Sequence, residues 1–232
     1  MSSGSGRVAD EDVTPIPASD YQLLLPEGWF RIPLDPGQRE RSVEALVERQ
    51  FKGTDDLPHV RNQLRQELLG RATEAFDEGG IELYISLQQA GPLTIPASLL
   101  VGLSLSPSAG ALPSLDDLAA RLSEDVSDEG ADGKHTRRDR QEISLVEIAA
   151  GRALRVRSQT EAPPEETGSP SGPDQEGDAY ALESVTLDYQ LPVPGAEAYL
   201  LLAFSTPLVP IADAMVDLFD AIAGSLTWKG VA

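Results

Sequence analysis

The passage from Tyr199 to Ile222 is the most apolar in the chain and constrains the fold more than any other segment. Tyr199 to Phe204 is an unbroken apolar run whose length suits a strand buried on both faces. Ser205-Thr206-Pro207 interrupts this run, and apolar residues then recur along one side of a helix, at Ile211, Met215, Leu218, Phe219 and Ile222. The passage therefore predicts a central strand that leads into an amphipathic helix.

Three carboxylates, Asp213, Asp217 and Asp220, lie on the other side of this predicted helix. A membrane span needs about 20 uninterrupted apolar residues, so these acids and two prolines exclude membrane insertion. The three carboxylates can bind a hard cation only loosely, because one rigid helix cannot wrap around an ion. We interpret them as a solvent-facing edge, with docking of a basic partner as the functional alternative.

The spacing of apolar residues predicts the remaining strands and helices. Alternation with period two predicts strands within residues 81–88, 97–106, 142–158 and 180–191, the third range containing two strands around Ala150-Gly151. Helical spacing predicts helices after the capping residues Asp35, Asp56 and Ser114. Pro26-Glu27-Gly28 has the composition of a turn, and it predicts a hairpin between short strands at 23–25 and 29–34.

Short turns between cleanly alternating strands favour antiparallel pairing. The sequence therefore predicts an α+β fold: a mostly antiparallel sheet of about six strands flanked by amphipathic helices, as an α/β/α sandwich. Residues 1–19 are predicted to be a disordered acidic tail, and residues 20–232 a single domain. Charged, glycine-containing residues 127–140 and the proline-rich, acidic residues 160–178 are predicted to be mobile loops.

Charge restricts the class of partner. Asp and Glu number 38 against 18 Lys and Arg, which gives a net charge of −20. The electrostatic field of this negative charge repels phosphate backbones and anionic lipid headgroups. We therefore expect no nucleic acid partner and favour a basic protein. One basic island contains Arg137 and Arg138, and it is either a docking patch for an acidic segment or a solubilising turn.

The sequence contains no pattern that supports catalysis. It has no cysteine, and its two histidines, His59 and His135, lie far apart in the sequence. No dinucleotide, Walker or nucleophile-elbow motif occurs. We therefore expect no catalytic residue, no metal and no cofactor. The polar start of the chain lacks the features of a secretory signal, so we expect a cytoplasmic protein.

Two short motifs resemble the PsbP-like fold: Leu25-Pro26-Glu27-Gly28-Trp29 at the start of the domain, and a last strand and helix that end in Phe219, Ile222, Ser225, Leu226 and Trp228. This fold is shared by an extrinsic photosystem protein, a Ran-binding import factor and small bacterial proteins. The composition looks actinobacterial, and similar proteins there look like accessory components of secretion systems. The resemblance implies a non-enzymatic binding or assembly role and supplies no site residue.

Three functional hypotheses follow. The first is a non-catalytic interaction or assembly module whose acidic surface docks a basic protein. The second is a small-molecule binder with an apolar pocket between the sheet and the helices of residues 40–78, where Trp29, Phe30 and Phe51 converge. The third is a hydrolase whose site the sequence does not reveal.

Overall fold

The computed structural model describes residues 20–51, 58–86, 88–90, 93–105, 112–129, 140–160 and 183–230. Its main sheet has seven strands in the order β2-β3-β6-β10-β9-β8-β7, all paired antiparallel. The strands are β2 (Trp29–Pro33), β3 (Gly80–Ser86), β6 (Ser98–Leu105), β7 (Arg140–Ile148), β8 (Gly151–Thr160), β9 (Ser184–Pro192) and β10 (Ala198–Thr206). The predicted α+β class is confirmed, with one strand more than the expected six.

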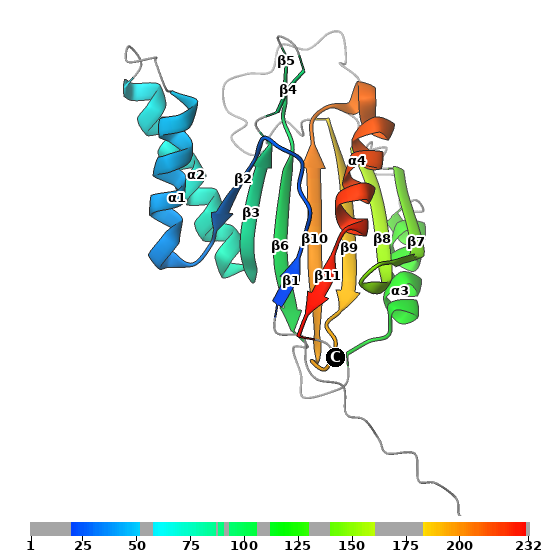
Figure 1. Ribbon diagram of the computed structural model, residues 1–232. Helices are drawn as coiled ribbons and strands as arrows, with labels where there is room; N and C mark the ends of the chain where they lie inside the picture. Colours follow the sequence, from blue (N-terminus) through cyan, green and yellow to red (C-terminus); the bar gives the residue numbers. More distant parts are fainter. Residues whose placement is uncertain are drawn as a thin grey trace, which may run out of the picture.

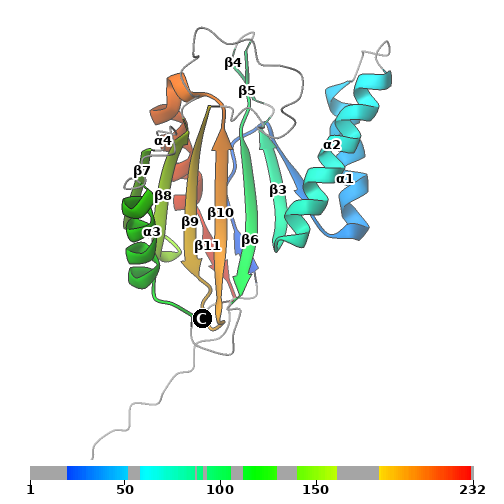
Figure 2. The ribbon, with the colours of Figure 1, turned by 180° about the vertical axis from the view of Figure 1, so that it is seen from behind.

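Helices lie on both faces of this sheet (Figures 1 and 2). They are α1 (Pro36–Gln50), α2 (Pro58–Asp77), α3 (Leu115–Glu129) and α4 (Ala212–Gly224). On one face, called the front, lie α4 and a ribbon of β1 (Asp20–Gln22) paired with β11 (Thr227–Lys229). On the other face, the back, α1 and α2 cover β2 and β3, and α3 covers β7 and β8. The helices therefore flank the sheet as predicted.

The predicted central strand is β10, the fourth of the seven strands. Its front-facing side chains Leu200, Leu202 and Phe204 are at most 1% exposed. They pack under α4, where the rings of Phe204 and Phe219 stack with centroids 4.9 Å apart. The strand and the amphipathic helix that follows it thus form the main core, as the opening apolar passage predicts.

Two of the predicted helix caps are present. The Asp35 side chain accepts a hydrogen bond from the Gly37 backbone N–H at 3.0 Å and starts α1. Before α3, the Ser114 hydroxyl accepts from the Asp117 backbone N–H at 3.1 Å, and the Asp117 carboxylate accepts from the Ser114 hydroxyl at 2.7 Å. Both caps satisfy helix N–H groups that have no partner within the helix.

The predicted hairpin around Pro26-Glu27-Gly28 is wrong, although the turn itself is present, with Gly28 at φ 93°. The two strands beside this turn pair with different partners: β1 pairs with β11, placing Tyr21 opposite Trp228, and β2 pairs with β3. The local pattern identifies a turn, but it carries no information about a partner strand at the far end of the chain.

A third sheet pairs β4 (Gln88–Ala90) with β5 (Leu93–Ile95).

Several sequence predictions lie outside the described residues. They are the tail 1–19, most of the loops 127–140 and 160–178, the cap Asp56, and Arg137 and Arg138. Within the described ranges, no helix is long and apolar enough to cross a membrane. The same ranges contain no group of three or more Asp, Glu or His side chains placed to hold a metal ion.

Candidate functional site

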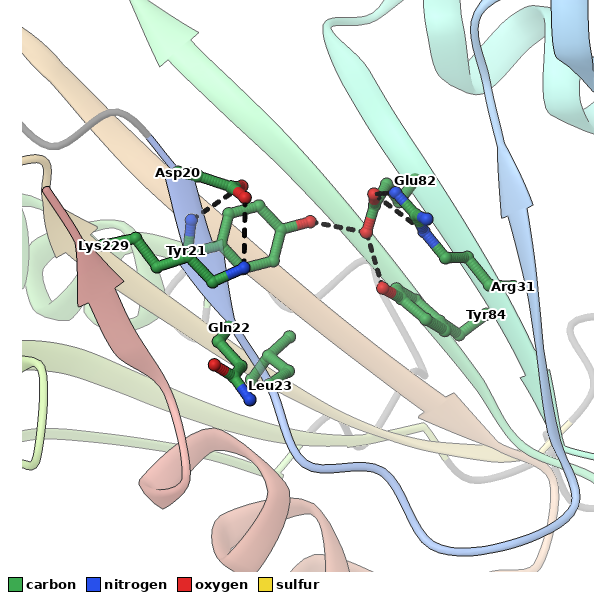
Figure 3. A pocket seen from close by; sticks show the side chains of 8 residues that line it. All are labelled: Asp20, Tyr21, Gln22, Leu23, Arg31, Glu82, Tyr84 and Lys229. Atoms are coloured by element: carbon green, nitrogen blue, oxygen red, sulfur yellow. Dashed lines mark hydrogen bonds and ion pairs between the residues drawn. The ribbon is translucent and has the colours of Figure 1, made fainter.

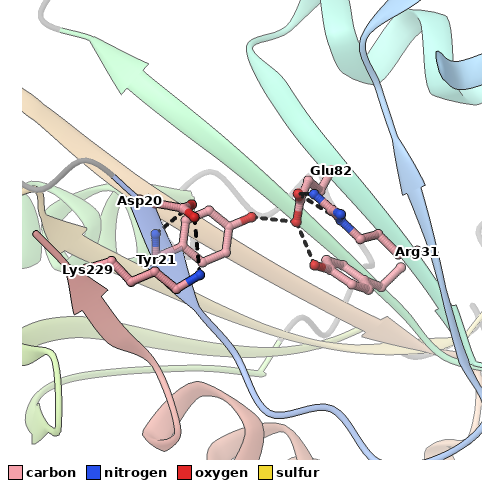
Figure 4. A network of polar contacts seen from close by, with 6 residues as sticks. Asp20, Tyr21, Arg31, Glu82 and Lys229 are labelled. Carbon is pink, nitrogen blue, oxygen red and sulfur yellow. Dashed lines mark hydrogen bonds and ion pairs between the residues drawn. The ribbon is translucent and has the colours of Figure 1, made fainter.

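Glu82 lies at the centre of a polar network on the front face (Figure 4). Its carboxylate accepts hydrogen bonds from the Tyr21 hydroxyl at 2.6 Å, the Tyr84 hydroxyl at 2.5 Å and Arg31 Nε at 2.9 Å, with a further contact to Arg31 Nη2. Burial pushes the pKa of Glu82 upward, but the hydrogen bonds from Arg31, Tyr21 and Tyr84 outweigh it and hold the pKa below its ordinary value. Both oxygens of the Glu82 carboxylate therefore accept hydrogen bonds.

The same residues line an open recess of about 260 Å³ between the β1–β11 ribbon and the edge of the main sheet (Figure 3). Lys229 Nζ lies 3.3 Å from a carboxylate oxygen of Asp20 at its margin. Burial, together with hydrogen bonding to Glu82, raises the pKa values of Tyr21 and Tyr84. Because none of these shifts moves a group toward neutral pH, the recess is suited to holding the ribbon on the sheet and not to proton transfer.

The carboxylates predicted on α4 have different roles in the structure. Asp220 accepts from Arg155 Nε at 2.8 Å and from Arg155 Nη2 at 3.0 Å, and it also accepts from the Tyr189 hydroxyl. Asp213 accepts from Arg157 Nη2 at 2.7 Å, although its own side chain is 89% exposed. Asp217 is exposed on the same helix.

The sequence interpretation of these acids as a plain solvent-facing edge is therefore incomplete. Two of the three carboxylates connect α4 to arginines of β8. The alternation of residues along β8 contained the missing signal. Arg155 and Arg157 lie on the front side of the strand, and they alternate with Leu154 and Val156, which pack under α3 on the back.

Among the described elements, no helix covers the middle of the back face, between the two groups of helices (Figure 2). It lies on β6, β10 and β9, and the antiparallel register sets its rows: Leu100, Ala203 and Asp188 are in line, and so are Gly102, Leu201 and Gln190. A third row consists of Ser98, Ser205 and Thr186. We call these nine residues the open strip. At its β6 margin Leu100 packs against the cluster of α1 and α2, and Gly102 is buried against the backbone of Gly79 and Gly80.

The strip is apolar at its centre. Leu201 and Ala203 are half-buried and pack in none of the three hydrophobic clusters, which belong to α4, to α1 with α2, and to α3. The sequence prediction that this strand is buried on both faces is thus correct for its front face and, on the back face, for Tyr199, which packs in the cluster of α3, whereas Leu201 and Ala203 are half-buried. A continuous apolar run suggests burial on both faces, but it does not reveal whether a helix is present to cover the second face.

Asp188 is the unusual residue of the strip. In its row it lies between Ala203 of β10 and Val156 of β8, and burial raises the pKa of its carboxyl to about 6. In the described part of the chain it accepts no hydrogen bond and makes no ion pair. A half-buried carboxylate with a shifted pKa and no counter-charge is a candidate binding group.

The apolar pocket of the second hypothesis does not form as expected. Ile32, Leu34, Val43, Leu46, Val47 and Ala72 pack as a buried cluster between α1, α2 and the sheet. Phe30 and Phe51 pack against this cluster, whereas Trp29 packs against the front core. The three aromatic residues therefore do not converge.

Comparisons with known proteins give a likeness of fold only. No family model and no curated protein matches the chain. The chain is similar to cyanobacterial PsbP (CyanoP) of Synechocystis sp. PCC 6803, at 14% identity and a TM-score of 0.42, over 97% of this chain and 98% of that chain. It is also similar to the Ran-binding protein Mog1p of Saccharomyces cerevisiae, at 13% identity and a TM-score of 0.36, over 63% of this chain and 77% of that chain.

These two findings agree with the PsbP-like fold that the sequence motifs suggest. With TM-scores of 0.42 and 0.36, they carry no argument about function.

Proposed function

We propose that this protein is a non-catalytic interaction module that docks another protein on the open strip. The observation that supports this is the gap in the back layer of helices: α1 and α2 cover one end of the sheet, α3 covers the other, and Leu201 and Ala203 lie between them without a covering element among the described residues. An apolar surface of this kind, bordered by polar side chains, is typical of a protein interface.

The shape of the strip favours a macromolecule over a small ligand. Small-molecule sites are concave and enclose most of the ligand. The strip is instead the face of three adjacent strands, with the small residue Ala203 in the middle. A surface of this kind offers broad contact rather than enclosure.

The chemistry of the described residues favours binding over catalysis. General acid–base or nucleophilic catalysis needs two groups within hydrogen-bonding distance of each other. Asp188 makes no hydrogen bond to a hydroxyl or imidazole in the described part of the chain, and Glu82 is held as a saturated carboxylate. The net charge of −20 favours a partner with a basic surface.

A second candidate docking region is the acidic edge of α4, where Asp217 is exposed between the paired Asp213 and Asp220, together with Arg137 and Arg138 outside the described residues. Helix α4 and the open strip lie on opposite faces of the sheet. Substitutions on each face therefore distinguish them.

The test compares Ala203→Arg on the strip with Ala221→Arg on the exposed side of α4. The two variants make the same chemical change on opposite faces, and far-UV circular dichroism with a thermal melt checks that both fold. The tagged wild-type protein and both variants are incubated with lysate of the source organism, and the captured proteins are compared by quantitative mass spectrometry.

We expect one protein, retained by the wild type and by Ala221→Arg, to be lost with Ala203→Arg. Loss with Ala221→Arg alone would assign docking to α4. Equal capture by all three proteins would contradict docking on the strip.

A further inference from the structure

We infer that the open strip takes one amphipathic helix of the partner, which lays an apolar stripe on Leu201 and Ala203 and directs a Lys or Arg side chain to Asp188. This inference rests on the proposed function, because it specifies the occupant of the same surface. It follows from three properties of the strip: its width, the size of its central side chain, and a carboxylate that has no partner among the described residues.

The width of the strip matches a helix. The flanking strands β3 and β8 are separated by β6, β10 and β9, and four strand spacings of about 4.8 Å place them roughly 19 Å apart. A helix with its side chains has a diameter of about 10–12 Å. One helix over β10 would therefore complete the back layer between α2 and α3, whereas an additional sheet on this face would collide with both.

The central side chains allow close approach. Large and small residues alternate across the two middle strands: Leu100 is opposite Ala203, and Gly102 is opposite Leu201. Leu100 packs against the cluster of α1 and α2, and Gly102 is buried against the backbone of Gly79 and Gly80, so the small side chain that an incoming helix can approach is Ala203. A larger side chain at position 203 would hold a helix away from the sheet.

The carboxylate specifies the charge of the occupant. Buried charges in proteins are normally paired, and Asp188 lies between two apolar neighbours. The arginines of β8 are used elsewhere: Arg155 and Arg157 pair with α4, and Arg152 pairs with Asp116 of α3. A cation from the partner would supply the missing charge.

Two other occupants fit less well. A second copy of the chain also has a net charge of −20, so two copies repel each other. The segment 161–182 connects the neighbouring strands β8 and β9, but it contains no Lys or Arg and four prolines. Repulsion therefore disfavours a second copy as the occupant. The prolines and the lack of a base disfavour segment 161–182 as a helix that brings a cation to Asp188.

Site-specific photocrosslinking tests the inference. p-Benzoylphenylalanine replaces Thr186, which lies two residues from Asp188 on the same face of β9, and a second probe replaces Ser205 in case the first impairs folding. After irradiation in lysate of the source organism, the crosslinked peptide is sequenced. The yield is then compared in Asp188→Asn and in the amide control Glu40→Gln on the exposed side of α1.

We expect the adduct to come from a different protein, from a segment with apolar residues at i, i+3, i+4 and i+7 and a Lys or Arg at the border of that stripe. Loss of the charge at Asp188 should reduce the yield at limiting protein concentration by roughly tenfold, because a half-buried charge pair loses its attraction. The Glu40→Gln variant should give the wild-type yield.

The other outcomes overturn the inference in distinguishable ways. An adduct to an extended or acidic segment, to a second copy, or to this chain itself would refute the helical basic occupant, as would equal yields from both amide variants. If in addition Ala203→Arg has no effect on capture, the proposed docking function fails as well. Loss of capture with Ala203→Arg, combined with a non-helical adduct, would refute the helix alone.

Discussion

At the scale of single residues, the structure contains two carboxylates in opposite situations. Glu82 receives hydrogen bonds from Tyr21, Tyr84 and Arg31, and its pKa is lowered. Asp188 receives none from the described residues, and burial raises its pKa to about 6. Glu82 therefore stabilises the free protein. Burial of Asp188 costs stability, which a bound partner can offset.

Replacing Asp188 by Asn should stabilise the free protein at pH 7.5. Since the folded-state pKa of about 6 lies above the ordinary 3.8, the protonated carboxyl favours folding, and that contribution is lost as the pH rises through 6. We expect a gain of about 1–2 kcal/mol in the free energy of unfolding at pH 7.5 and almost none at pH 4. Urea denaturation of the wild type and the variant at both pH values measures this difference in the free energy of unfolding. A variant that is less stable at pH 7.5 would show that Asp188 already has an internal cation.

Replacing Glu82 by Gln should destabilise the protein by about 2–3 kcal/mol, because the Glu82 side chain is only 13% exposed and its charged hydrogen bonds weaken. The lowered pKa of Glu82 means that its contribution is present above the ordinary 4.5 and is lost as the pH falls through the folded-state value. The deficit of the variant should therefore shrink below pH 4. Glu40→Gln on the exposed side of α1 is the control, and an equal effect of both changes would contradict the role of Glu82.

At the scale of elements, α4 holds the front of the molecule together. Its buried side, with Met215, Phe219 and Ile222, covers β9 and β10, and its acidic side pairs with β8. Strand β11, which pairs with β1 to form the ribbon, follows directly after it in the chain. Loss of helix packing should therefore affect both the sheet and the ribbon.

Truncating Phe219 to Ala should cost about 3–5 kcal/mol, because a stacked and fully buried ring is replaced by a cavity. Ile211→Ala is the control, since Ile211 is 47% exposed and its truncation should cost under about 1 kcal/mol. Chemical denaturation of the two variants gives the comparison. Similar losses would show that α4 does not form the core contact described.

The elements themselves could be predicted because their signals are local. Asp35 and Ser114 start helices by capping them, and the alternation of Val185, Leu187 and Tyr189 marks a strand with one buried face. The pairing of Tyr21 with Trp228 and the ion pair of Arg155 with Asp220 could not be predicted, because each joins segments that are distant in the sequence. The open strip also escaped prediction, because it is defined by the lack of a covering helix among the described residues.

At the scale of the whole molecule, the two faces of the sheet differ in completeness. The front face is closed by α4 and the β1–β11 ribbon, while the back face has helices at both ends and the open strip between them. The described helices therefore leave a position in the back layer for one more helix. The acidic charge of the chain favours a basic partner for that position.

The most direct measurement of this claim compares two alanine methyl groups on opposite faces by NMR. The protein, labelled with ¹³C at its alanine methyl groups, is titrated with unlabelled lysate of the source organism, and the signals of Ala203 and Ala221 are followed. We expect the Ala203 signal to shift or broaden as the partner covers the strip, while the Ala221 signal stays sharp. An unchanged Ala203 signal beside a broadened Ala221 signal, or no change in either, would contradict docking on the open strip.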